Sequence, residues 1–373
     1  MRLAFSTPYA IAPKDITPPP DDGLSRHVNH PEIPAAYPPF TQLVNWVSAG
    51  FGDRVQTPRL LLTILIVLAD LLILFLLFRR GGSPFFLYGI HPLPLLEFSG
   101  ELHIDGIGVA LLLLAFINAS HRAAFKGLCI GLSAGIKPIA FFAFFALPSR
   151  RINRHRVAMV AVLFFCLPSL PFLLDGAPLF QGLTEYATRW ESHPMGFLVL
   201  KYALSLGTDS ALGIPAFTHL HLTQNPLGLL LENGGQPIIT MGNAAFSSRP
   251  FLLDINLLAR SCSMVCIFII AVRIRTACLP PHFKLMVVLS LFFFFSPTIH
   301  PWYLTWVLPF VALSTHMPLW MSSLFILFFH QSAIHQRFHG EWVVAEWPRI
   351  VVCCVFLVTS LLVHLFKQQG KHR

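Results

Sequence analysis

Apolar stretches recur along this 373-residue chain at lengths suited to membrane-spanning helices. A helix needs about 20 apolar residues to cross a bilayer, and a shorter stretch crosses by borrowing loop residues or thinning the lipid locally. The pattern predicts an all-α fold, a polytopic membrane helix bundle of about nine spans with loops on the outer face. The predicted spans lie near residues 60–78, 84–98, 105–119, 157–173, 253–272, 285–297, 303–316, 318–331 and 349–366.

A further apolar stretch, 127–147, is interrupted by Gly135, Lys137 and Pro138. Proline lacks the backbone N–H that a helix interior requires, so one continuous helix is unfavourable here. We therefore expect a re-entrant hairpin or two half-helices in addition to the nine spans.

The distribution of charge predicts the direction of the spans. Five short segments carry more than half of the 26 Lys and Arg residues and none of the 17 acidic residues. Loops rich in Lys and Arg stay in the cytoplasm, which places all five on that side. The five segments lie at 79–80, 122–126, 150–156, 273–284 and 367–373.

This topology divides the chain into three parts. Residues 1–58 form a Pro-rich segment on the outer face, residues 59–366 the membrane domain, and residues 367–373 a basic cytoplasmic tail. An outer N-terminal segment requires a preceding span or signal sequence, unless it is translocated without a leader. We expect that the natural chain begins upstream and contains one more span.

Composition narrows the class of protein. Only 12% of the residues are charged and 55% are hydrophobic, whereas soluble domains carry about 25% charged residues. A soluble enzyme and a nucleic-acid-binding domain are excluded, and the net charge of +9 is a signal of topology. The seven cysteines lack metal-ligand spacing, and no nucleotide-binding motif is present, so no cofactor is expected and nothing indicates a divalent cation.

Ionisable residues cluster where the spans near 84–98 and 105–119 meet the outer face. Glu97, His103 and Asp105 lie within nine residues, close to hydrocarbon, where charge is costly. Asp105 precedes a predicted helix and is therefore either an N-cap or a functional carboxylate. A histidine and a carboxylate in an aqueous pocket can bind sugar hydroxyls, hold a metal or move a proton.

A second outer cluster contains His300, Trp302 and Tyr303. The two aromatic residues suit the interfacial belt of a membrane protein, whereas His300 beside them suggests stacking on a sugar and binding of a phosphate. Tyr37 lies in the Pro-rich segment, which is either a stiff linker or a loop held over a site.

Three ionisable residues, Asp70, Lys137 and Arg260, fall inside apolar stretches. Such groups face the bundle interior and pair with one another or with a ligand, so they form structural ion pairs or a lipid-phosphate site. Residues 183–191 are expected to form an amphipathic helix lying on the outer surface.

Taken in order, the motifs resemble those of bacterial multi-pass glycosyltransferases of the C-type superfamily, most closely the mannosyltransferases that use polyprenyl-phosphate mannose. The motifs are Asn29-His30-Pro31-Glu32, Tyr37-Pro38-Pro39, Glu97, His103-x-Asp105, Gly135-x-Lys137-Pro138, Tyr186, Trp190, Ser296-Pro297 and His300-Pro301-Trp302-Tyr303, with Trp306 and Pro309.

The resemblance implies inverting transfer of a hexose, most simply mannose, from a polyprenyl-phosphate donor to a lipid or glycan acceptor. The reaction would occur on the outer face of a bacterial inner membrane. The family's usual catalytic Asp would lie upstream of this sequence. Here the resemblance assigns Asp105 and His103 to the catalytic site, where they would bind a donor or acceptor sugar or assist the base. It assigns to substrate binding Glu97, Lys137, His300, Trp302, Tyr303 and Tyr37, with Lys137 and His300 stabilising the departing phosphate.

Two alternatives remain open at this point. A flippase or secondary transporter for lipid-linked sugars also buries charged residues, although transporters often contain internal repeats and none is visible here. An inactive, truncated member of the family is the other. In every case the expected partners are lipid-linked sugars and membrane lipid, and no nucleic acid.

Overall fold

The computed structural model describes residues 7–16, 28, 31–55, 59–117, 122–147, 153–211, 255–339 and 343–369. Within these ranges the chain is helical, and its only β-type pairing is a single parallel bridge between Ser192 and Thr298. Five helical segments are long and apolar enough to cross a membrane. They are α3 (Leu60–Phe78), Arg154–Leu174, which contains α9 (Arg154–Cys166) and α10 (Leu170–Leu174), α13 (Ile255–Thr276), Met317–His339, which contains α16 (Met317–Phe325) and α17 (His330–His339), and α18 (Trp347–Gln369).

The expectation of a multi-pass helical membrane protein therefore agrees with the described helices. Five of the nine predicted spans coincide with the five long segments. Two others correspond to the shorter apolar helices α6 (Asp105–Ile117) and α14 (Pro281–Phe294).

The remaining two predicted spans, 84–98 and 303–316, are not continuous helices. The first consists of α4 (Gly82–Gly89), the short α5 (Pro92–Pro94) and a π-helical turn over Leu95–Gly100. The second consists of a 3-10 turn over Pro301–Trp306 and α15 (Leu308–Ser314). Prolines within both stretches favour the first turn of a new helix, which explains the breaks.

The stretch around Lys137 reverses direction, as expected for a re-entrant hairpin. Helix α7 (Ala123–Ala134) runs antiparallel to α6, because Ser133 Oγ donates to Gly108 O (2.7 Å) while the Lys126 amine donates to Ala115 O near the other end of α6. A 3-10 turn (Pro138–Phe142) and α8 (Ala143–Ala146) then return the chain.

Contacts with α9 show where this hairpin ends. A Cβ atom on Gly127 would lie 2.6 Å from Val157 O, and one on Gly131 would lie 2.4 Å from Ala161 O, so α7 and α9 run parallel in close contact. The Arg154 guanidinium at the start of α9 donates to Leu147 O, just after α8. The hairpin therefore enters and leaves at the same end of the bundle, with Lys137 at the opposite end.

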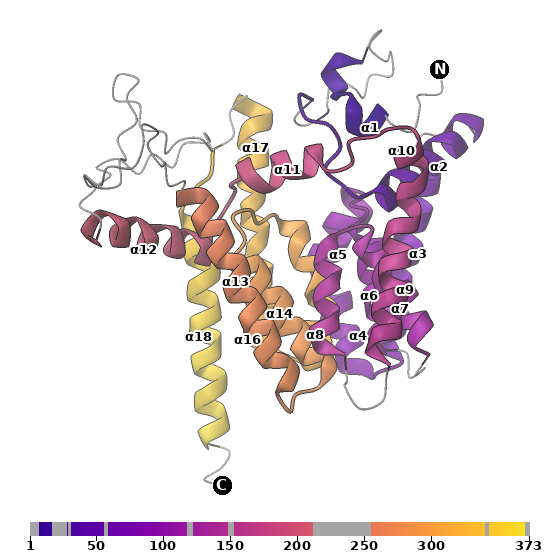
Figure 1. Cartoon of the computed structure of the whole chain (residues 1–373). Helices are drawn as coiled ribbons and strands as arrows, with labels where there is room; N and C mark the ends of the chain where they lie inside the picture. The colour runs from indigo at the N-terminus through magenta and orange to yellow at the C-terminus, as the bar shows by residue number, and fades with distance from the viewer. Residues whose placement is uncertain are drawn as a thin grey trace.

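Basic residues gather at the end where the hairpin enters. The Arg80 guanidinium donates to Ile117 O at the end of α6, and Lys284 Nζ donates to Arg275 O (2.9 Å). We call this the basic end; the opposite end, where Asp105 begins α6, is the site end. Figure 1 shows α1 (Thr7–Ala10) and α11 (Gln181–Arg189) together at the end far from the C-terminus.

The Pro-rich N-terminal segment contains a helix that the sequence analysis did not predict. Helix α2 (Pro39–Val55) packs on α3, and Trp46 and Val47 on it are about half exposed. The predicted amphipathic helix over 183–191 is present as α11, and it is followed by α12 (Gly196–Ala211).

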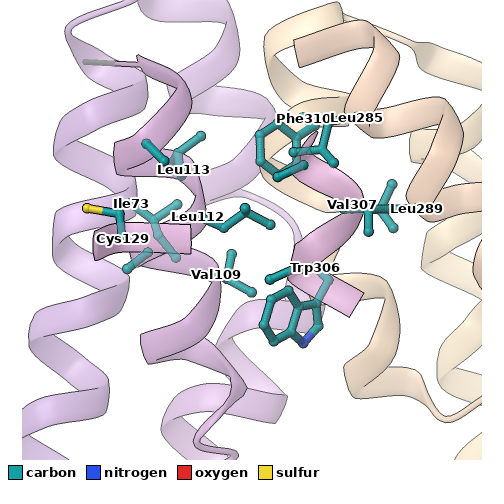
Figure 2. Packing of buried hydrophobic residues seen from close by; sticks show 14 of the residues in the cluster. Ile73, Val109, Leu112, Leu113, Cys129, Leu285, Leu289, Trp306, Val307 and Phe310 are labelled. Carbon is teal, nitrogen blue, oxygen red and sulfur yellow. The ribbon is translucent and has the colours of Figure 1, made fainter. Parts of the chain in front are cut away.

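The largest apolar core joins the two halves of the bundle beneath the site end. Trp306, Val307 and Phe310 belong to this core, and Figure 2 shows Phe310 beside Leu285 and Val307 beside Leu289, with the Trp306 ring on the side of Val109. The core continues through α6, α7 and α3 with Val109, Leu112, Leu113, Cys129 and Ile73. This core holds Trp306 at the site end.

Candidate functional site

Asp105 is the centre of a polar cluster at the site end. Its side chain is fully buried, and Oδ1 accepts hydrogen bonds from Lys137 Nζ (2.7 Å) and Trp306 Nε1 (2.6 Å). Among the described residues, Oδ2 has no hydrogen-bond partner. Both bonds come from other elements and neither from a backbone N–H of α6, so the N-cap interpretation is not supported. One oxygen of the carboxylate is held by two donors, and the other is buried without a hydrogen-bond partner among the described residues.

Lys137 reaches Asp105 from the tip of the re-entrant hairpin. At the break between α7 and the following 3-10 turn its backbone is extended, with Pro138 at the first position of the turn. Its ammonium also lies 3.9 Å from the ring centroid of Tyr303, a distance suited to a cation–π contact. Lys137 was predicted to bind substrate phosphate, and in this structure its charge pairs with Asp105.

Two further tyrosines surround this ion pair. The hydroxyls of Tyr186, on α11, and Tyr303 are hydrogen-bonded to each other. Burial raises the pKa of Tyr186 to about 12, and burial together with the charge of Asp105 raises the pKa of Tyr37 well above its ordinary value. Both phenols are therefore neutral at physiological pH and can donate a hydrogen bond to an anion or a sugar oxygen.

Trp302 is covered on both faces. The imidazoles of His103 and His300 each stack on its ring with centroids 4.3 Å apart, at interplanar angles of 19° and 5°. Two rings at this distance cannot share one face without overlapping, so they lie on opposite faces. The predicted stacking of Trp302 on a sugar is therefore blocked in this arrangement. Its Nε1 is buried without a hydrogen-bond partner among the described residues, and this donor is what Trp302 offers a ligand.

His300 is a neutral imidazole in this environment. Burial lowers its pKa well below the ordinary value, and the nearby charge of Lys137 acts in the same direction. The sequence analysis expected His300 to bind phosphate, and a charge-assisted bond would require the protonated form. The structure favours a hydrogen bond from the neutral ring instead.

Glu97 forms the second buried carboxylate of the cluster. It is fully buried within the π-helical turn, a feature often found at functional sites. His330 Nε2 lies 2.8 Å from Oε1, and His103 Nε2 lies 3.3 Å from Oε2. Burial lowers the pKa of His103, while the charges of Asp105 and Glu97 oppose that shift.

The structure thus gathers all eight sequence-predicted site residues at one end of the bundle, either in direct contact or, for Tyr37, through its electrostatic interaction with Asp105. Three contributors had no predicted role: Trp306, Tyr186 and His330. Trp306 and Tyr186 belonged to the motifs named above, but their roles follow only from their contacts with Asp105 and Tyr303 in the structure. His330 gave no local signal beyond a polar residue at the end of an apolar stretch.

The two other intramembrane ionisable residues have partners outside the Asp105 cluster. Asp70 accepts a hydrogen bond from Tyr88 (2.7 Å) between α3 and α4, and Arg260 binds backbone carbonyls at the end of α11. In the described part of the chain, no three His, Cys, Asp or Glu side chains are arranged to hold a metal ion.

No protein-family model, curated protein or solved structure matches this chain. The helical bundle, its membrane-length segments and the chemistry of the Asp105 cluster are therefore the basis for assigning a function.

Proposed function

We propose that this protein is a membrane glycosyltransferase that moves a hexose, most simply mannose, from a polyprenyl-phosphate donor to a lipid or glycan acceptor. The reaction takes place at the outer face of a bacterial inner membrane, with the basic end and the C-terminus in the cytoplasm. The observation that supports the proposal is the buried Asp105 carboxylate, with one oxygen held by Lys137 and Trp306 and the other without a partner among the described residues.

Asp105 acts as the general base. The acceptor hydroxyl binds at Oδ2, and its oxygen attacks the anomeric carbon from the face opposite the phosphate. The bond between that carbon and the phosphate oxygen breaks, and the hydroxyl proton passes to Oδ2. The configuration at the anomeric carbon is inverted. The two donors on Oδ1 hold the carboxylate in one orientation, which is the positioning that proton transfer requires.

Lys137 links proton transfer to departure of the phosphate. Before reaction its ammonium pairs with the carboxylate of Asp105. When Asp105 accepts the proton, that carboxylate loses its charge at the moment when the leaving phosphate gains charge. Lys137 is then released to pair with the phosphate, an interaction stronger in the transition state than in the ground state.

The Glu97 cluster supplies groups for the sugars. The oxygens of Glu97 and the imidazoles of His103 and His330 can accept and donate hydrogen bonds to hydroxyl groups. The Nε1 donor of Trp302 and the phenol of Tyr37 complete this set.

The position of the cluster favours an enzyme over a transporter. Asp105 is the first residue of α6, a helix of 13 residues and about 20 Å, so the site lies at one end of the bundle. Transporters bind their substrates near the bilayer midplane.

The test is transfer of labelled mannose from polyprenyl-phosphate mannose in membranes that contain the protein. We expect Asp105→Asn to lower turnover at least about 100-fold, the scale of general-base groups. Because this change leaves the buried Lys137 charge without its counterion, the double variant Asp105→Asn/Lys137→Gln separates loss of folding from loss of chemistry.

Asp70→Asn is the matched control, because Asp70 is another carboxylate within an apolar helix, partly buried and bonded to Tyr88 between α3 and α4. It should retain transfer. Unchanged transfer by Asp105→Asn would refute Asp105 as the base. If the wild-type protein moves the intact lipid-linked sugar across vesicles and forms no glycosidic bond, the flippase interpretation replaces this one.

A further inference from the structure

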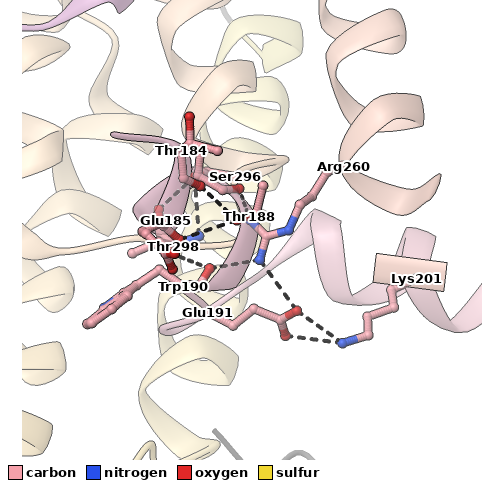
Figure 3. A network of polar contacts seen from close by, with 10 residues as sticks. Thr184, Glu185, Thr188, Trp190, Glu191, Lys201, Arg260, Ser296 and Thr298 are labelled. Carbon is pink, nitrogen blue, oxygen red and sulfur yellow. Dashed lines mark hydrogen bonds and ion pairs between the residues drawn. The ribbon is translucent and has the colours of Figure 1, made fainter. Parts of the chain in front are cut away.

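Helix α11 supplies Tyr186, whose hydroxyl is hydrogen-bonded to Tyr303 of the site. Arg260 of α13 binds the C-terminal end of α11. Arg260 Nη1 donates to Ala187 O (2.7 Å) and Nη2 donates to Trp190 O (2.9 Å). Figure 3 shows the guanidinium of Arg260 reaching from its helix toward Trp190 and Glu191. The last carbonyls of a helix lack partners within it and carry partial negative charge, so a guanidinium stabilises this end by hydrogen bonding and by charge.

The end of α11 is also fixed to the strand-like segment that precedes Trp302. Thr298 Oγ1 donates to Trp190 O (2.9 Å), and Ile299 N donates to Ser192 O (2.7 Å). Glu191 adds a salt bridge to Lys201 Nζ (3.1 Å) and lies 3.7 Å from the Arg260 guanidinium (Figure 3). Arg260, at 9% exposure, is buried in this network and joins the end of α11 to the membrane helix α13.

An unbroken series of contacts runs from α11 to Asp105. Tyr186, one residue before Ala187, is hydrogen-bonded through its hydroxyl to Tyr303. The ring of Tyr303 lies 3.9 Å from Lys137 Nζ, and Lys137 is paired with Asp105 at 2.7 Å. A change in the orientation of α11 would therefore shift the Tyr303 ring that contacts the ammonium of Lys137.

We infer that Arg260 is a positioning residue for the Asp105–Lys137 site, acting through α11 and Tyr186. The inference rests on the proposed transferase function. The planar fork of the guanidinium gives each carbonyl its own donor nitrogen, whereas a lysine at this position would have to serve both from one ammonium nitrogen on a more flexible stem. Loss of the fork removes both hydrogen bonds from Arg260 to the C-terminal end of α11, so the Tyr186 hydroxyl is held less firmly against Tyr303.

The experiment compares Arg260→Gln and Arg260→Lys with the wild type by two measurements. The first is the kcat and KM of mannose transfer. The second is limited trypsin cleavage after Arg189, at the end of α11, in detergent-purified protein. We expect Arg260→Gln to lower kcat at least tenfold with KM changed less than threefold, and to speed cleavage at least tenfold. Arg260→Lys, which keeps the charge and is expected to fold, should fall between.

Arg349→Gln is the matched control. Arg349 is a buried arginine of α18 that donates to Pro194 O (3.0 Å), farther along the same segment, but it does not bind the carbonyls of α11. We expect this variant to keep both the wild-type kcat and the wild-type cleavage rate.

A double-mutant cycle with Tyr186→Phe tests whether the effect passes through the tyrosine. If Arg260 acts through Tyr186, the double variant should have the kcat of the more impaired single variant, within about twofold. If the kcat of the double variant is lowered by the product of the two single decreases, the effect does not pass through Tyr186. A wild-type kcat in Arg260→Gln despite faster cleavage would also overturn the inference. If the wild-type protein forms no glycosidic bond, the proposed function fails, and the cleavage rates alone decide whether Arg260 holds α11.

Discussion

A methyl group added to Gly108 would disturb the site without removing any polar group. Gly108 lies on α6 one turn after Asp105, and a Cβ there would stand 2.6 Å from Cη2 and 2.9 Å from Cζ2 of Trp306. Carbon atoms pack at about 3.5–4.0 Å, so the indole must move by about 1 Å. Trp306 is fully buried, and Ile136, 3.1 Å from the same Cβ, restricts the space available.

The size of the effect follows from the bond that Trp306 makes. Its Nε1 lies 2.6 Å from Asp105 Oδ1, so a shift of about 1 Å weakens that bond and reorients the carboxylate. Misplacement of a catalytic group by about 1 Å costs on the order of 100-fold in rate, equivalent to about 2.7 kcal/mol. Overpacking lowers the free energy of unfolding by about 1–3 kcal/mol, and the better helix propensity of alanine offsets up to about 1 kcal/mol of that loss.

We therefore expect Gly108→Ala to lower mannose transfer 10- to 100-fold while the protein still accumulates in the membrane. Transfer activity is measured per amount of folded protein, determined by size-exclusion chromatography in detergent. Gly50→Ala on α2 is the control for the substitution itself, because within the described residues nothing beyond its own stretch of helix lies within 4 Å of the added Cβ. Transfer at the wild-type rate by Gly108→Ala would refute the argument that Trp306 positions Asp105.

Two further predictions concern topology and pH. A cysteine in place of the exposed Thr188 should react with a membrane-impermeant maleimide from the outer face, whereas one in place of the exposed Asn153 should not, and the reverse pattern would invert the assigned orientation. His193 is buried between Ser192 and Ser332, and burial lowers its pKa from 6.5 to about 4. The unfolded chain then binds the proton more readily than the folded protein between these values, so stability is full above pH 6.5 and falls by up to about 3 kcal/mol as the pH drops to 4. Thermal unfolding in detergent across this range should show the loss in the wild type and not in His193→Gln, and equal profiles for the two would contradict it.

Several features of this protein follow from local sequence alone. Long apolar runs require helices in lipid, because no other open structure satisfies the backbone there. Gly135 and Pro138 make a continuous helix unfavourable, so the reversal at Lys137 was predictable. The grouping of basic residues away from acidic ones predicted that they share one end of the bundle, and the described Arg80, Lys126 and Arg154 lie at such a common end. Sequence order and residue type also identified Asp105 and Lys137 as candidates for one site.

Only the tertiary structure decided which side chains of the site touch. Lys137 and Trp306 meet at one oxygen of Asp105 from 32 and 201 positions away, and His330 meets Glu97 from 233 positions away. Such contacts depend on how helices are placed and rotated against one another, which the hydrophobic pattern of each helix does not specify. The same packing covers both faces of Trp302. It also buries His300, which lowers the pKa of this imidazole and favours its neutral form. These two outcomes depend on neighbours that residue type cannot reveal, because burial and stacking are properties of the packed bundle.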